Sequence, residues 1–62
     1  MNGYVCFWNG KRVEVHAVAS FAAQQAALPE FQRIAGRKKV KRQDITAVLC
    51  EKAGEQVTHT PA

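Results

Sequence analysis

Five cationic side chains lie within six consecutive positions of the stretch GRKKVKRQD at 36–44. They are Arg37, Lys38, Lys39, Lys41 and Arg42, interrupted only by Val40. Guanidinium and ammonium groups at this density can contact several backbone phosphates and release their counterions, which gives salt-dependent and largely sequence-independent binding. The same pattern is also typical of a solvated loop, or of a targeting signal in a nucleated cell.

Two cysteines and two histidines, Cys6, Cys50, His16 and His59, form a legitimate zinc ligand set by residue type. Their spacing argues against a zinc site, because no C-x-x-C or H-x-x-x-H pair brings two ligands together locally. The acidic residues are scattered along the chain, and the sequence holds no glycine-rich phosphate loop. We therefore expect no metal, no cofactor and no enzymatic activity.

The positive charge of the chain is confined to the basic stretch. The formal net charge is +4, from nine Lys and Arg against five Asp and Glu. Five of the nine cations lie in that stretch, so the rest of the chain carries −1. At 62 residues, the chain is expected to be a single small domain, 1–62, of modest stability. Within it, residues 36–43 form the predicted connecting segment, called the basic loop below.

The chain lacks the patterns of secreted and membrane proteins. Its first apolar stretch precedes its first basic residues, unlike the order of a signal peptide, and no run approaches the roughly 20 apolar residues of a membrane span. We therefore expect a cytoplasmic protein in which Cys6 and Cys50 stay reduced. Both cysteines are interpreted as small core residues.

The stretch YVCFWNGKRVEVHA at 4–17 predicts a β-hairpin. Asn9-Gly10 suits a type I′ turn, which needs two positive φ angles, so strands are expected at about 3–8 and 11–17. The two-residue turn pairs Trp8 with Lys11 and fixes the register. The predicted core face collects Tyr4, Cys6, Trp8, Val13, Val15 and Ala17. The other face carries Val5, Phe7, Arg12, Glu14 and His16.

The Ala- and Gln-rich stretch at 20–36 predicts a helix, with Ser20 as N-cap and Gly36 as the stop. Pro29 should kink this helix, or begin a second short one. One broad face is expected to cover the sheet through Phe21, Leu28 and Phe31, extended by Ala27, Ile34 and Ala35.

A third strand is expected at about 44–52 and a polar edge strand at about 55–60. The fold class is therefore α+β, in the order β-β-α-β-β, with one helix on a four-stranded antiparallel sheet. The expected strand order is 2-1-3-4, which we favour over a parallel βαβ crossover. In this arrangement the second face of the sheet is bare.

An aromatic side chain beside a cation on that second face can stack on a base. The candidate nucleic-acid interface therefore combines Phe7 and Arg12 with the cations of the basic loop, which are Arg37, Lys38, Lys39, Lys41 and Arg42. The alternative is that Phe7 and Val5 are covered by the basic segment, the chain termini or a partner chain.

Two parts of the chain resemble small proteins of tailed bacteriophages. The first combines Tyr4, Cys6, Gly10 and Lys11 with the alanine-rich run 17–27, and the second is VLCEKAGEQVTHT at 48–60. Pro29 and the length of the basic run depart from that pattern. The hairpin and helix also resemble, more loosely, the arm-type DNA-binding domain of lambda-type integrases, whose third strand before the helix this chain lacks.

The bacteriophage resemblance implies an accessory protein that binds a host or phage macromolecule, in the cytoplasm of the host cell. Two partners follow. The first is a nucleic acid, contacted through its phosphates by the basic loop and the sheet face. The second is a host protein, bound by the same face or by a strand edge. A homodimer is a third alternative, because an uncovered apolar strip favours self-association.

Overall fold

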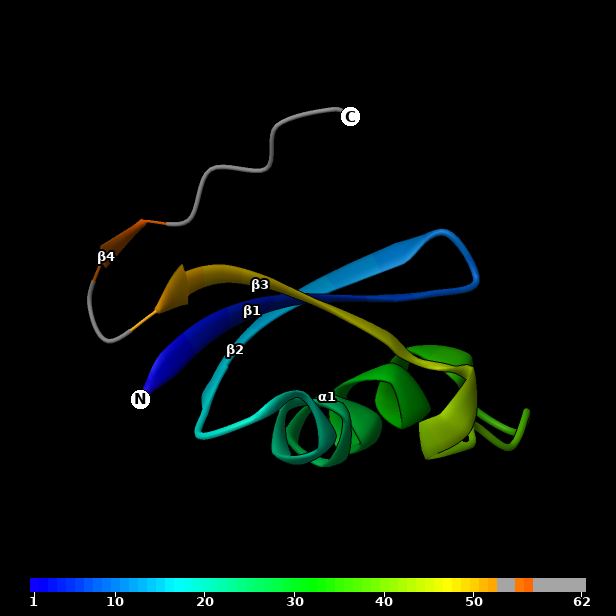
Figure 1. Cartoon of the computed structure of the whole chain (residues 1–62). Helices are drawn as coiled ribbons and strands as arrows, with labels where there is room; N and C mark the ends of the chain where they lie inside the picture. Colours follow the sequence, from blue (N-terminus) through cyan, green and yellow to red (C-terminus); the bar gives the residue numbers. More distant parts are fainter. Residues whose placement is uncertain (53–54, 57–62) are drawn as a thin grey trace.

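The computed structural model describes residues 1–52 and 55–56, and in it one helix covers one face of an antiparallel sheet (Figure 1). The strands β1 (Asn2–Trp8), β2 (Lys11–Ala17) and β3 (Thr46–Lys52) lie in the order β2-β1-β3. The α+β class and this order of three strands confirm the prediction. A two-residue strand, β4 (Glu55–Gln56), pairs with the end of β3. The rest of the predicted edge strand, 57–60, lies outside the described residues.

The hairpin of β1 and β2 forms as its sequence predicts. Asn9 and Gly10 have φ angles of 47° and 73°. Positive φ at both central residues is the requirement of a type I′ turn. The strands pair from Trp8 with Lys11 to Asn2 with Ala17. Residues of β1 therefore alternate between the helix side and the opposite side, as expected.

β3 pairs with β1 on the side away from β2, with Tyr4 opposite Leu49 and Phe7 opposite Thr46. The register shifts between Gly3 and Tyr4, so Gly3 lies opposite Glu51. β3 begins two residues later than predicted, because Asp44 belongs to the short 3-10 helix η1 (Arg42–Asp44). The sheet face turned away from the helix, called the open face below, carries Val5, Phe7, Arg12, Glu14, His16, Thr46 and Val48.

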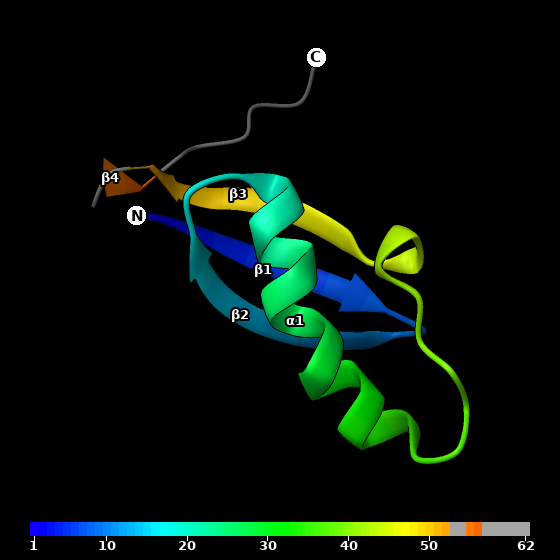
Figure 2. The same cartoon turned by 90° about the horizontal axis from the view of Figure 1, so that it is seen from below.

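The helix α1 (Ser20–Ala35) is continuous and contains Pro29. Figure 2 shows that its axis changes direction partway along, and the backbone hydrogen bond that proline cannot donate accounts for a bend. The predicted N-cap is wrong by one residue: Ala19 is the N-cap, in an extended conformation, and Ser20 is already helical. Gly36 ends the helix with a φ of 66°, as predicted. No helix in the described part is long and apolar enough to cross a membrane.

The core lies between α1 and the helix side of the sheet. Ala23, Ala27 and Phe31, spaced four residues apart, are fully buried, and Phe31 packs against Trp8 with ring centroids 6.0 Å apart. The two alanines let the helix approach the sheet closely. The predicted core-facing side of the helix is therefore partly wrong. Phe21 and Ile34, which were expected to face the sheet, are 53% and 48% exposed.

Candidate nucleic-acid interface

The basic loop is attached to the helix by the side chain of Gln32. Its Nε2 donates to the carbonyl oxygens of Gly36 and Lys38, at 3.1 and 2.8 Å. Its Oε1 accepts from the backbone N–H of Val40, at 3.0 Å. One glutamine therefore contacts the backbone at three points of the turn between the helix and the cationic segment. The basic loop is therefore fastened to α1 through its backbone, and we call it the strap below. Arg37, Lys38, Lys39 and Lys41 are exposed, as they would be in a solvated loop as well.

A second glutamine, two turns earlier on α1, holds the far end of the strap. The Nε2 of Gln24 donates to the carbonyl oxygen of Ile45 at 2.6 Å, and its Oε1 accepts from Nη1 of Arg42 at 3.0 Å. The guanidinium of Arg42 also lies over the ring of Phe21, 4.3 Å from the centroid. Arg42 is half-buried by these contacts, so its orientation is set before any ligand binds.

Between these anchors, Val40 inserts into the core and is 5% exposed. Its neighbours Lys39 and Lys41 are exposed. Because the backbone is extended at Lys41, side chains on either side of the buried valine project away from the core. The single apolar residue of the cationic run therefore orients the two lysines beside it outward.

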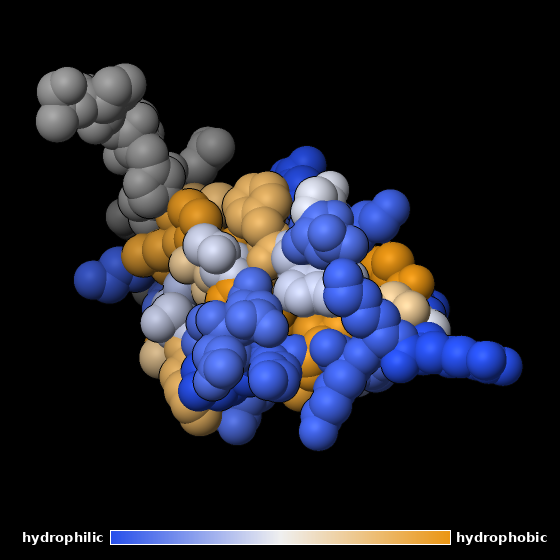
Figure 3. All heavy atoms as spheres, turned by 90° about the vertical axis from the view of Figure 1, so that its right-hand side faces the viewer, coloured by the Kyte–Doolittle hydropathy of each residue, from blue (hydrophilic) through white to orange (hydrophobic). Residues whose placement is uncertain are grey.

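The strap passes the hairpin turn at the end of the molecule seen in Figure 3, where hydrophilic side chains cover much of the surface. A hollow of about 300 Å³ lies there, lined by Trp8, Asn9, Lys38, Lys39 and Asp44. Nζ of Lys38 lies over the Trp8 ring, 5.7 Å from its centroid. The strap and the hairpin turn thus form one surface.

Lys11 adds a sixth cation to this end of the molecule. It pairs with Trp8 across the hairpin, so its side chain leaves the sheet on the same face as Trp8, whose ring Lys38 contacts. The sequence prediction omitted Lys11, although the Asn-Gly register already placed it opposite Trp8. The anchoring roles of Gln24 and Gln32 carried no sequence signal, because glutamine on a helix is usually solvated.

The cations of the basic loop are not neutralised within the part of the chain that the structure describes. Its two ion pairs are Arg12 with Glu14, at 3.1 Å, and Arg33 with Glu30. Neither includes a residue of the strap. The strap therefore presents a concentrated positive field to solvent, with Asp44 as the acidic residue at its edge.

The structure separates the two halves of the predicted interface. Phe7 and Arg12 pair with each other on the open face, whereas Lys38 and Arg42 contact Trp8 and Phe21 on the helix side. The predicted composite surface is therefore wrong. The alternation of side chains along β1 correctly predicted which face carries Phe7. The path of the strap could not be predicted in the same way, because it depends on contacts between segments far apart in the sequence.

The four candidate zinc ligands are also not gathered together. Cys6 is fully buried on the helix side, where desolvation raises the pKa of its thiol, while His16 lies on the open face. Cys50 is half-buried beside the open face, so its predicted place in the core is wrong. His59 lies outside the described residues. Among residues 1–52 and 55–56, no group of three potential ligands could hold a metal ion.

No family model, curated protein or solved structure matches this chain. The resemblances to bacteriophage proteins and to the integrase domain therefore stay predictions.

Proposed function

We propose that this protein is a small, non-enzymatic accessory protein that binds the phosphate backbone of a nucleic acid through the basic loop. The observation that carries the proposal is the anchored strap, whose backbone is held by hydrogen bonds and carries five cations without acidic partners among the described residues. A pre-ordered array loses less conformational entropy on binding than a flexible loop of equal charge.

The cations have different parts in this proposal. Lys39 and Lys41 point outward and supply mobile point charges for phosphates. Arg42, oriented by Phe21 and Gln24, keeps further N–H donors for a directional contact with phosphate oxygens. Arg37 and Lys38 extend the array along the same strap, and Phe7 and Arg12 are left out of it.

The experiment is a salt titration of binding to random-sequence duplex DNA, single-stranded DNA and RNA. For duplex DNA, the logarithm of the binding constant falls against that of the salt concentration with a slope of about −0.9 per phosphate neutralised. We expect Lys39→Gln with Lys41→Gln to reduce the magnitude of this slope by about 1.8, because two phosphate contacts are lost.

The matched control is Arg12→Gln with Lys52→Gln, which changes the net charge equally but removes cations of β2 and of β3. We expect this control to keep the slope of the wild-type protein. An equal loss in both variants would show that net charge alone drives binding. Absence of binding to all three nucleic acids at low salt would refute the proposal.

Two finer features belong to the proposal as well. We infer that the edge of the sheet beside β3 continues as the predicted fourth strand at about 55–60, which gives the order 2-1-3-4. We also propose a cytoplasmic location, supported by Cys6 and Cys50, which are both free thiols.

A further inference from the structure

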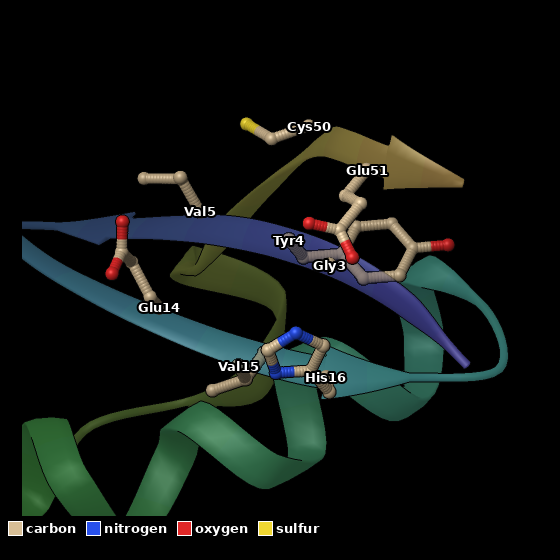
Figure 4. A pocket seen from close by; sticks show the side chains of 8 residues that line it. All are labelled: Gly3, Tyr4, Val5, Glu14, Val15, His16, Cys50 and Glu51. Carbon is tan, nitrogen blue, oxygen red and sulfur yellow. The ribbon is translucent and has the colours of Figure 1, made fainter. Parts of the chain in front are cut away.

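The open face contains a hollow where β1 lacks a side chain. Gly3 lies between His16 of β2 and Glu51 of β3, and Figure 4 shows these two side chains on either side of it. A Cβ atom at Gly3 would lie 3.0 Å from Cβ of Glu51 and 3.6 Å from Nε2 of His16. The hollow has a volume of about 180 Å³, and Val5, which is 9% exposed, is among the residues that line it.

The same strand carries a projecting aromatic ring on the same face. Phe7 is 42% exposed and lies four residues from Gly3, with Val5 midway between them. A strand rises about 3.4 Å per residue, so the ring and the hollow are separated by about 14 Å and are placed symmetrically about Val5. A projection and a recess placed in this way are complementary to a second copy of the same surface.

We propose that two copies of this chain associate through their open faces, with Phe7 of each copy in the Gly3 hollow of the other. The two-fold axis passes between the two Val5 residues. It lies between the two sheets, parallel to both and perpendicular to their strands, so the interface is isologous. The two sheets then pack face to face, about 10 Å apart, as in a β-sandwich. A cavity of about 150 Å³ is enough to hold benzene, so the ring of Phe7 fits the hollow by size.

The polar residues of the open face match in the same arrangement. The symmetry brings Arg12, which lies beside Phe7, opposite His16 of the partner copy, while Glu14, which lies beside Val5, stays near the axis. On the other side it brings the hydroxyl of Thr46, also beside Phe7, toward the carboxylate of Glu51. Each hydrophobic insertion is therefore flanked by polar groups of both neighbouring strands, with the charge of Arg12 compensated by Glu14 of its own strand.

The charge of this face disfavours a polyanion as its occupant. Among the described side chains of the open face and its hollow, Arg12 is outnumbered by Glu14 and Glu51. The basic loops of the two copies lie on the helix sides, which face outward in the dimer, so they do not repel each other across the interface. A nucleic acid would meet negative charge here, so the symmetric projection of Phe7 and recess at Gly3, and not charge, point to a second copy as the occupant.

The test measures the dimer dissociation constant by sedimentation velocity for the wild type and two variants. We expect Phe7→Ala to raise this constant at least about tenfold, as removal of a central aromatic anchor does. The control is Ile34→Ala, which shortens an equally exposed apolar side chain on α1 and is expected to leave the constant unchanged. Circular dichroism confirms that both variants fold.

A second measurement tests the geometry directly. In a mixture of isotope-labelled and unlabelled protein, we expect intermolecular nuclear Overhauser effects between the ring protons of Phe7 and those of His16. A wild-type protein that is monomeric up to about 1 mM overturns the inference, because affinity that weak is below that of a specific dimer. A dimer that survives Phe7→Ala, or that shows no contact between Phe7 and His16, overturns it as well.

Discussion

Cys6 and Cys50 lie on different sides of the sheet and have different surroundings. The thiol of Cys6 is fully buried against α1, where its Sγ donates to the carbonyl oxygen of Ala23 at 3.7 Å. Cys50 lines the hollow on the open face and is half-buried. Burial penalises the thiolate of Cys6 and raises the pKa of its thiol above the ordinary value of 9.0.

This raised pKa predicts a dependence of stability on pH. In the unfolded chain, Cys6 loses its proton as the pH passes its ordinary pKa, whereas in the native protein it stays protonated to higher pH. Its contribution to stability is therefore complete below the ordinary pKa and is lost as the pH rises through the native value. We expect the free energy of unfolding to fall more steeply above pH 9.0 in the wild type than in Cys6→Ala.

Denaturant unfolding on both sides of that pH measures the effect. The Cys6→Ala variant has a smaller core side chain and a lower stability at every pH, so the slopes are compared and not the absolute values. Parallel slopes in the two proteins would contradict the prediction.

At the scale of the elements, the start of α1 is not optimised. The N-cap residue Ala19 has no side-chain acceptor for the N–H groups of the first helical turn. We expect Ala19→Ser to raise the free energy of unfolding by about 1 kcal/mol, because its hydroxyl can accept one of these N–H groups. Ser20→Ala should change it by less than about 0.5 kcal/mol, since Ser20 is inside the helix.

Thermal or denaturant unfolding of the two variants distinguishes the observed N-cap from the one that the sequence predicts. If Ser20 were the cap, its replacement by alanine would cost about 1 kcal/mol and Ala19→Ser would have little effect. The reverse order of effects would therefore contradict the structure at this position.

The strap depends on Gln32 more than on any of its own cations. Gln32→Ala removes three hydrogen bonds and leaves the partly buried N–H of Val40 without its acceptor. We expect a loss of about 1–3 kcal/mol in the free energy of unfolding, measured in denaturant. Gln25→Ala, at an exposed position on the same helix, is the control and should stay within about 0.5 kcal/mol of the wild type. Equal effects of the two changes would show that Gln32 does not anchor the strap.

The elements that the sequence predicted correctly are those with local causes. Asn9-Gly10 sets both the turn and the register of the hairpin, and Gly36 supplies the positive φ that ends α1. Apart from the N-cap, which was placed one residue too late, the main errors concern contacts between distant segments. The helix packs on the sheet through Ala23, because alanine allows close approach. The path of the strap is set by Gln24 and Gln32, whose backbone partners lie between 4 and 21 residues away.

At the scale of the whole molecule, the two proposed surfaces lie on opposite sides. The strap runs along the helix layer, and the open face is the far side of the sheet. In the proposed dimer both straps face outward, so one assembly presents two separate sites. Two linked sites on one polyanion bind more tightly than one, provided that the polyanion can reach both.

The strap is anchored mainly by neutral groups, namely the amide of Gln32 and the buried side chain of Val40. Dissolved ions screen charges in water but have little effect on amide hydrogen bonds and apolar contacts. Raising the ionic strength should therefore weaken the proposed binding of a polyanion while the basic loop keeps its conformation. Rebinding after dilution of the salt would then need no refolding step.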